Sequence, residues 1–83
     1  NRRHLTEARV TLLNDLRLKR RDILETLNKA LTTDNEQVAD ALLEVVQRDL
    51  AQIAEAGRPD RAFAGLARAF RKQLGDEINR RLS

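Results

Sequence analysis

The chain has 83 residues, which places it at the small end of single-domain size and predicts one domain over residues 1–83. It has no Cys, Met, Trp or Tyr and only two Phe, so disulfides and thiolate metal sites are excluded and the core depends on aliphatic residues. The net charge is only +3 and no apolar run approaches the roughly 20 residues of a membrane helix, so we expect a cytoplasmic protein without a membrane partner.

The first predicted helix covers residues 5–31. Leucine and isoleucine recur there at spacings of seven and four, which places them on one helical face. These residues are Leu5, Leu12, Leu16, Ile23, Leu27 and Leu31. Residues 1–21 hold seven basic residues against two acidic ones, so the helix begins as a basic block.

The second predicted helix covers residues 34–56. Thr33 and Glu36 have the spacing of a capping box, in which each side chain accepts a free backbone N–H. Apolar residues cover more than one narrow stripe, so we expect burial on a wide arc and a central position in the fold. Six acidic residues stand against Arg48 alone. Gly57 and Pro59 then predict a tight corner.

The third predicted helix covers residues 59–82 and is again basic. Its apolar residues recur at spacings of three and four: Phe63, Leu66, Ala67, Phe70, Leu74, Ile78 and Leu82. Gly65 and Gly75 each cost roughly 1 kcal/mol relative to Ala inside a helix, which indicates either a close approach of another backbone or a break. A break at Gly75 would leave a short fourth helix.

These elements predict an all-α fold, because the sequence carries no strand pattern. The two short connections favour antiparallel neighbours, and therefore an antiparallel three-helix bundle. An acidic helix between two basic ones would neutralise the charges inside such a fold. The aliphatic core is small, so we expect self-association to stabilise it.

Catalytic chemistry lacks its usual parts in this sequence. His4 is the only histidine and lies near the start of the chain, without a second metal ligand or a nucleophile close in sequence. Asp40 and Glu44 lie one turn apart, but Arg48 continues their row, which is typical of a solvated charge ladder. We therefore expect no enzyme activity, no cofactor, no metal and no small-molecule substrate.

Apolar residues outside the predicted core face indicate a protein-interaction surface. Leu18 lies away from the apolar stripe of the first helix, and Leu43, Val46 and Leu50 extend the arc of the second. We expect a helical interaction or regulatory module that binds a protein partner, or itself as a homo-oligomer, through an apolar face flanked by arginine.

A second hypothesis is binding of nucleic acid through basic helix faces. Guanidinium groups spaced three and four residues apart can contact successive phosphates. The candidate phosphate contacts are Arg17, Arg20, Arg21, Arg58, Arg61, Arg68 and Lys72.

The segments Leu27–Leu31, Asp34, Ala54–Gly57 and Arg61–Phe63 resemble the helix-turn-helix of addiction-module antidote proteins, over less than half of the chain. This resemblance implies a small DNA-binding regulator. Its recognition helix would span Asp60–Phe70, with Arg58, Arg61 and Arg68 toward DNA. The family has a glycine-containing break where this chain continues through Gln47–Leu50, so an uninterrupted helix there disfavours the second hypothesis.

Overall fold

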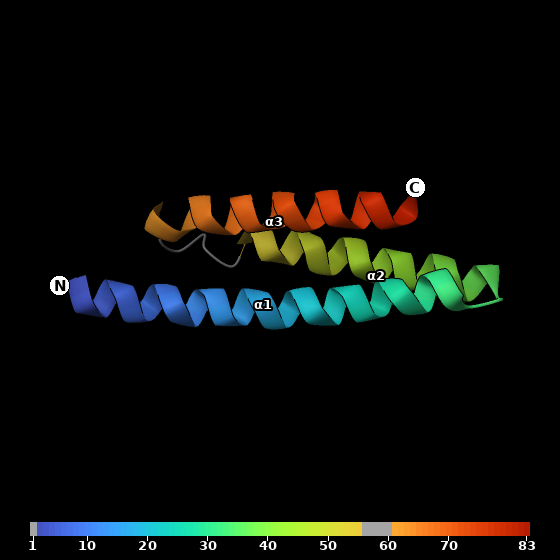
Figure 1. Ribbon diagram of the computed structural model, residues 1–83, viewed down its shortest axis with the longest axis horizontal. Helices are drawn as coiled ribbons and strands as arrows, with labels where there is room; N and C mark the ends of the chain where they lie inside the picture. Colours follow the sequence, from blue (N-terminus) through green and yellow to red (C-terminus); the bar gives the residue numbers. More distant parts are fainter. Residues whose placement is uncertain (1, 56–60) are drawn as a thin grey trace.

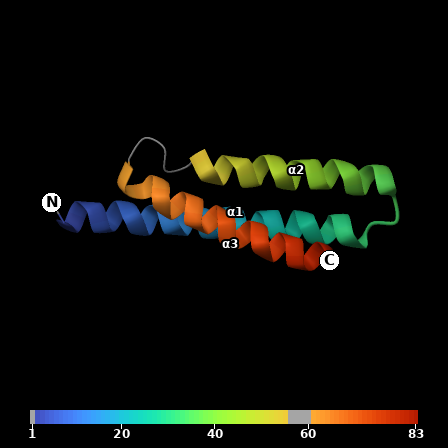
Figure 2. The ribbon, with the colours of Figure 1, turned by 90° about the horizontal axis from the view of Figure 1, so that it is seen from above.

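The computed structural model describes the backbone of residues 2–55 and 61–83, and the side chains of residues 7–53, 55 and 63–83. Within these ranges it contains three helices, α1 (Arg2–Thr32), α2 (Glu36–Glu55) and α3 (Arg61–Leu82), and no strand. Each helix packs against the other two, and the chain reverses direction between successive helices (Figures 1 and 2). The all-α fold of three packed helices is confirmed.

Several predicted features lie outside the described residues. The corner at Gly57 and Pro59 is among them, as are the side chains of His4, Arg58 and Arg61.

The turn between α1 and α2 is closed by Asn35. Its Oδ1 accepts hydrogen bonds from the backbone N–H groups of Gln37 (2.9 Å) and Val38 (3.2 Å), so Asn35 is the N-cap of α2. The predicted capping box of Thr33 and Glu36 is therefore wrong. Thr33 Oγ1 instead accepts the N–H of Asn35 at 3.3 Å, because it lies two residues too early to reach the first helical turn.

The third helix is unbroken, so of the alternatives considered for Gly75 the break, with its short fourth helix, does not occur. A Cβ atom at Gly65 would have no neighbour within 4 Å, and one at Gly75 would meet only Leu50 Cδ2, at an ordinary 3.9 Å. Neither glycine is therefore required for close backbone approach. Packing against α1 and α2 outweighs the low helix propensity of two glycines, about 1 kcal/mol each.

The core lies where the three helices overlap, along the middle of the bundle. Figure 1 shows that α1 and α2 extend beyond the end of α3, and that α1 and α3 extend beyond the end of α2. Leu31 and Leu82, predicted as core residues, lie near the first of these ends and are 48% exposed each. The buried cluster comprises Leu16, Ile23, Leu27, Val46, Ile53, Leu74 and Ile78.

The arc of α2 is only partly covered. Val38 and Val45 remain 44% and 36% exposed, although α2 contacts both other helices. The apolar residues of this helix therefore exceed what the monomer can bury.

The molecule is elongated, with extents of 52 × 19 × 16 Å and a radius of gyration of 14.6 Å, against about 12 Å for a compact chain of this length. Its surface of 6380 Å² exceeds by roughly 1300 Å² the area typical of a 9.5 kDa monomer. None of the helices in the described part of the chain combines the length and hydropathy needed to cross a bilayer. The monomer thus leaves an unusual amount of its surface in contact with solvent.

Candidate functional site

A surface groove lined largely by apolar side chains lies between α2 and α3, with a volume of about 420 Å³. Residues spaced three and four apart on each helix turn one apolar face toward it. Its apolar lining consists of Leu43, Val46 and Leu50 from α2 and Ile78 and Leu82 from α3. We call this hollow the α2–α3 groove.

Burial differs along the groove. Val46 is only 2% exposed and Ile78 6%, so these side chains form its floor and belong to the core. Leu43 and Leu50 are partly buried and pack against that core. Gly75 lies beside Leu50 and has no side chain to fill the space above it. The groove is therefore a packed apolar surface with one open side.

Polar side chains form the rim of the α2–α3 groove. Gln47 contributes from α2, and Arg71, Lys72, Asp76 and Asn79 contribute from α3. All five are exposed. An apolar strip flanked by long cationic side chains suits a partner that presents an apolar face with acidic flanks.

Of the four predicted interface residues, Leu43 and Leu50 line the groove with partly buried side chains, while Leu18 does not line it. The prediction that Val46 lies outside the core face is wrong, because its side chain is buried in the core beneath the groove. Leu18 is 51% exposed and lies two residues from the fully buried Leu16, hence on the opposite side of α1. Sequence reasoning missed the α3 half of the groove. The available signal was Gly75, which indicated either a close backbone approach or a break and instead lies in the groove without a side chain.

The predicted phosphate contacts separate into two regions. Arg17, Arg20 and Arg21 are exposed on α1, whereas Lys72 lies on the rim of the α2–α3 groove. On the other side of α3, Arg20 and Arg80 share one surface hollow, and Arg20, Arg21 and Arg81 share another. Arg68 is exposed on α3. Arg80 and Arg81 of α3, which were not predicted as phosphate contacts, therefore lie beside the arginines of α1.

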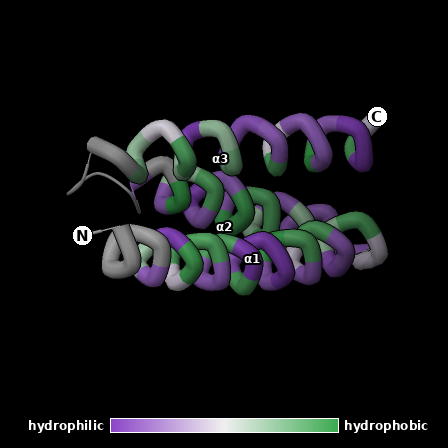
Figure 3. Tube along the Cα trace, turned by 60° about the vertical axis from the view of Figure 1, so that its left-hand side comes forward, coloured by the Kyte–Doolittle hydropathy of each residue, from purple (hydrophilic) through white to green (hydrophobic). Residues whose placement is uncertain are grey.

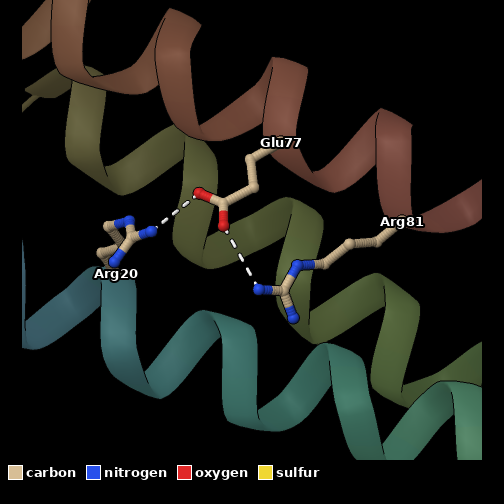
Figure 4. A network of polar contacts seen from close by, with 3 residues as sticks. All are labelled: Arg20, Glu77 and Arg81. Atoms are coloured by element: carbon tan, nitrogen blue, oxygen red, sulfur yellow. Dashed lines mark hydrogen bonds and ion pairs between the residues drawn. The ribbon is translucent and has the colours of Figure 1, made fainter.

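One carboxylate bridges α1 and α3 within this cluster (Figure 4). Glu77 Oε2 accepts a hydrogen bond from Arg20 Nη2 at 2.8 Å, and Glu77 Oε1 accepts one from Arg81 Nη2 at 3.2 Å. The hydrogen bond from Arg20 is the largest cause that lowers the pKa of Glu77 below its ordinary 4.5, and Arg81 contributes in the same direction. Glu77 thus neutralises part of the basic surface.

The ion pairs bear on the charge pattern predicted for Asp40 and Glu44 of α2. Among the described side chains, the ion pairs are Arg20–Glu77, Arg81–Glu77 and a 3.8 Å contact of Arg21 with its neighbour Asp22. None of them includes Asp40 or Glu44 of α2. Asp40, Glu44 and Arg48 are all exposed, which agrees with the solvated charge row predicted for them, and the first two do not pair with the basic helices.

The structure also bears on the two other site hypotheses. The described residues hold no group of three or more side chains that could bind a metal ion. Helix α2 is uninterrupted through Gln47–Leu50, the feature that disfavours a helix-turn-helix. A helix-turn-helix joins its helices at about 90–120°, whereas α2 and α3 run antiparallel side by side (Figure 1).

Comparisons with models of known protein families, with curated proteins and with solved structures find no match for this chain.

Proposed function

We propose that this protein is a non-enzymatic helical interaction module that binds an apolar helix face in the α2–α3 groove and acts as a homo-oligomer. The observation that carries this proposal is the groove itself, in which apolar side chains of two helices meet beneath a rim containing Arg71 and Lys72. Grooves between helices commonly receive the apolar face of an amphipathic helix.

The hydropathy of the bundle supports the same conclusion. Figure 3 shows hydrophobic residues interspersed with hydrophilic ones along α2, and hydrophobic residues on the inner side of α3 with hydrophilic residues along its outer side. Leu82 is 48% exposed at the end of the groove. An occupant would therefore remove leucine side chains from water, at roughly 25 cal/mol for each Å² of apolar surface.

A substitution at Gly75 tests this proposal without removing any core side chain. Gly75→Gln places a polar side chain in the groove, and Gly65→Gln makes the same change where a Cβ atom has no neighbour within 4 Å. We expect Gly75→Gln to weaken both dye binding to apolar surface and self-association, measured by fluorescence and by sedimentation. Gly65→Gln should leave both near the wild-type values. Equal behaviour of the two variants would contradict the proposal.

A second candidate function is the binding of a polyanion such as DNA through the basic surface of α1 and α3. The observation that favours it is the shared exposure of Arg20 and Arg21 with Arg80 and Arg81 across two helices. Such binding would weaken steeply as salt rises, because each phosphate contact releases counterions.

A DNA titration at low and moderate salt tests the second candidate. We expect the double substitution Arg21→Ala with Arg80→Ala to reduce both the affinity for DNA and the dependence of that affinity on salt concentration. Arg68→Ala should have the same effect only if the part of α3 that carries Arg68 also contacts DNA. Helicity, followed by circular dichroism, should not change. Absence of binding at low salt would eliminate this candidate and leave the interaction module.

A further inference from the structure

The α2–α3 groove has opposite charges at its two ends. Leu50 lies beside Gly75, and the two helices run antiparallel, so Leu43 lies near Leu82 at one end. By the same register, Arg71 and Lys72 lie toward the other end, near the end of α2. The groove therefore has a leucine-lined end and a basic end.

Two acidic residues of α2 lie next to the leucine-lined end of the groove. Asp40 precedes the rim residue Gln47 by seven residues, and Glu44 precedes it by three, so both lie on or beside the rim face of α2. Both are exposed. Helix α3 ends at Leu82 and does not run alongside the first turns of α2, where α1 is the neighbouring helix (Figure 1).

Neither end is neutralised within the monomer. The ion pairs among the described side chains do not include Asp40, Glu44, Arg71 or Lys72. The apolar strip is thus bordered by Asp40 and Glu44 toward one end and by Arg71 and Lys72 toward the other, with the rim carboxylate Asp76 between these ends on α3. A complementary surface would present the same apolar strip with the two signs exchanged end to end.

A second copy of this chain presents that surface when it is turned through 180°. We infer that two copies pack groove to groove in an antiparallel arrangement, with Asp40 and Glu44 of each copy over Arg71 and Lys72 of the other. A two-fold interface of this type uses the same patch on both molecules and closes on itself. This inference rests on the proposed function and specifies its occupant.

The available area agrees with a dimer. A standard interface buries about 800 Å² on each partner, and the monomer exposes roughly 1300 Å² more than a compact chain of its mass. The elongated shape makes a long groove-to-groove contact accessible, and dimerisation would make up for the small monomer core.

Charge reversal tests both the occupant and its direction. The acidic-end variant is Asp40→Lys with Glu44→Lys, and the basic-end variant is Arg71→Glu with Lys72→Glu. Each alone brings like charges together at both ends of the dimer, so we expect self-association at least about tenfold weaker. Combining all four substitutions restores opposite charges in an antiparallel pair, and self-association should return toward the wild-type value. An equimolar mixture of the two variants should form a heterodimer.

The control is Asp15→Lys with Glu25→Lys, which reverses two exposed carboxylates on α1 and should leave self-association unchanged. Sedimentation equilibrium measures all variants at one low salt concentration, with helicity checked by circular dichroism. If each reversal leaves self-association unchanged, or if the fourfold variant fails to recover while remaining helical, the antiparallel arrangement is wrong.

The wild-type chain separates failure of this inference from failure of the proposed function. A wild-type monomer whose dye binding is lost in Gly75→Gln but kept in Gly65→Gln would overturn the second-copy inference and leave the groove as a site for another helix. A wild-type monomer with no dye binding to apolar surface would overturn both.

Discussion

The two sides of α3 differ in how their charges and apolar groups are satisfied. On the α1 side, Glu77 accepts hydrogen bonds from Arg20 and Arg81, so opposite charges meet within the chain. On the α2 side, an apolar groove lies open beside Gly75, and Arg71 forms none of the ion pairs among the described residues. The α1 side therefore neutralises part of its charge within the chain, whereas the α2 side has both exposed apolar surface and unpaired charge available for a partner.

The largest expected effect comes from the core beneath both sides. Ile53 is fully buried, so Ile53→Ala should lower the free energy of unfolding by about 2–5 kcal/mol through lost apolar contacts and the cavity left behind. Val45→Ala, on the same helix at a side chain 36% exposed, should cost less than about 1 kcal/mol. Urea denaturation measures both. If the two substitutions lowered the free energy of unfolding by similar amounts, Ile53 would not belong to the core that the three helices share.

The next effect concerns the N-cap at the start of α2. Asn35→Ala removes the acceptor for two backbone N–H groups and should destabilise the protein by about 1 kcal/mol. Thr33→Ala loses only a 3.3 Å contact to the N–H of Asn35, so its cost should be smaller. Thermal unfolding of both variants gives the order. The reverse order would restore Thr33 as the helix cap.

The two glycines of α3 separate the effect of helix propensity from that of the groove. Gly65→Ala and Gly75→Ala should each stabilise the monomer by about 0.5–1 kcal/mol, because Ala favours a helix interior and both positions accept a Cβ atom. Only Gly75→Ala should also weaken self-association, measured by the concentration dependence of sedimentation. Weaker self-association in both variants would show that the α2 side has no special role.

The smallest effect belongs to the α1 side. Because the pKa of Glu77 is lowered in the folded protein, its stabilisation is present above pH 4.5 and is lost as the pH falls through the lowered value. Glu77→Gln should therefore reduce the loss of thermal stability between neutral and acid pH. Glu25→Gln, which removes an exposed carboxylate outside the ion pairs of the described residues, serves as the control. Identical pH profiles for wild type and Glu77→Gln would contradict the bridge.

Periodicity alone predicted much of the fold. The spacing of Leu16, Ile23 and Leu27 identified the buried face of α1, and the spacing of Leu74 and Ile78 identified that of α3. Exposure of Leu31 and Leu82 could not be read from spacing, because it depends on where neighbouring helices end. Local competition decided the helix cap, since Thr33 and Asn35 can both accept backbone N–H groups and only geometry places one of them next to the first turn.

The sequence predicted the α2 part of the candidate site and missed the α3 part. Surplus apolar residues on one helix pointed to Leu43 and Leu50, and the structure brings both into the α2–α3 groove. The α3 half depends on the register of α2 against α3, which no pattern within one helix contains. Net charges of segments suggested pairing between α2 and its neighbours, whereas the ion pair between α1 and α3 uses Glu77, an acid within a basic helix. Segment totals do not report which side chains meet.

The most direct test of the central claim, that the α2–α3 groove binds a second copy, is sedimentation equilibrium of the wild-type chain from low to high micromolar concentration, beside Gly75→Gln. We predict that the wild type approaches twice the monomer mass as concentration rises, while Gly75→Gln stays nearer the monomer mass. A wild type that remains monomeric throughout, or a Gly75→Gln variant that associates as strongly as the wild type, would contradict the claim.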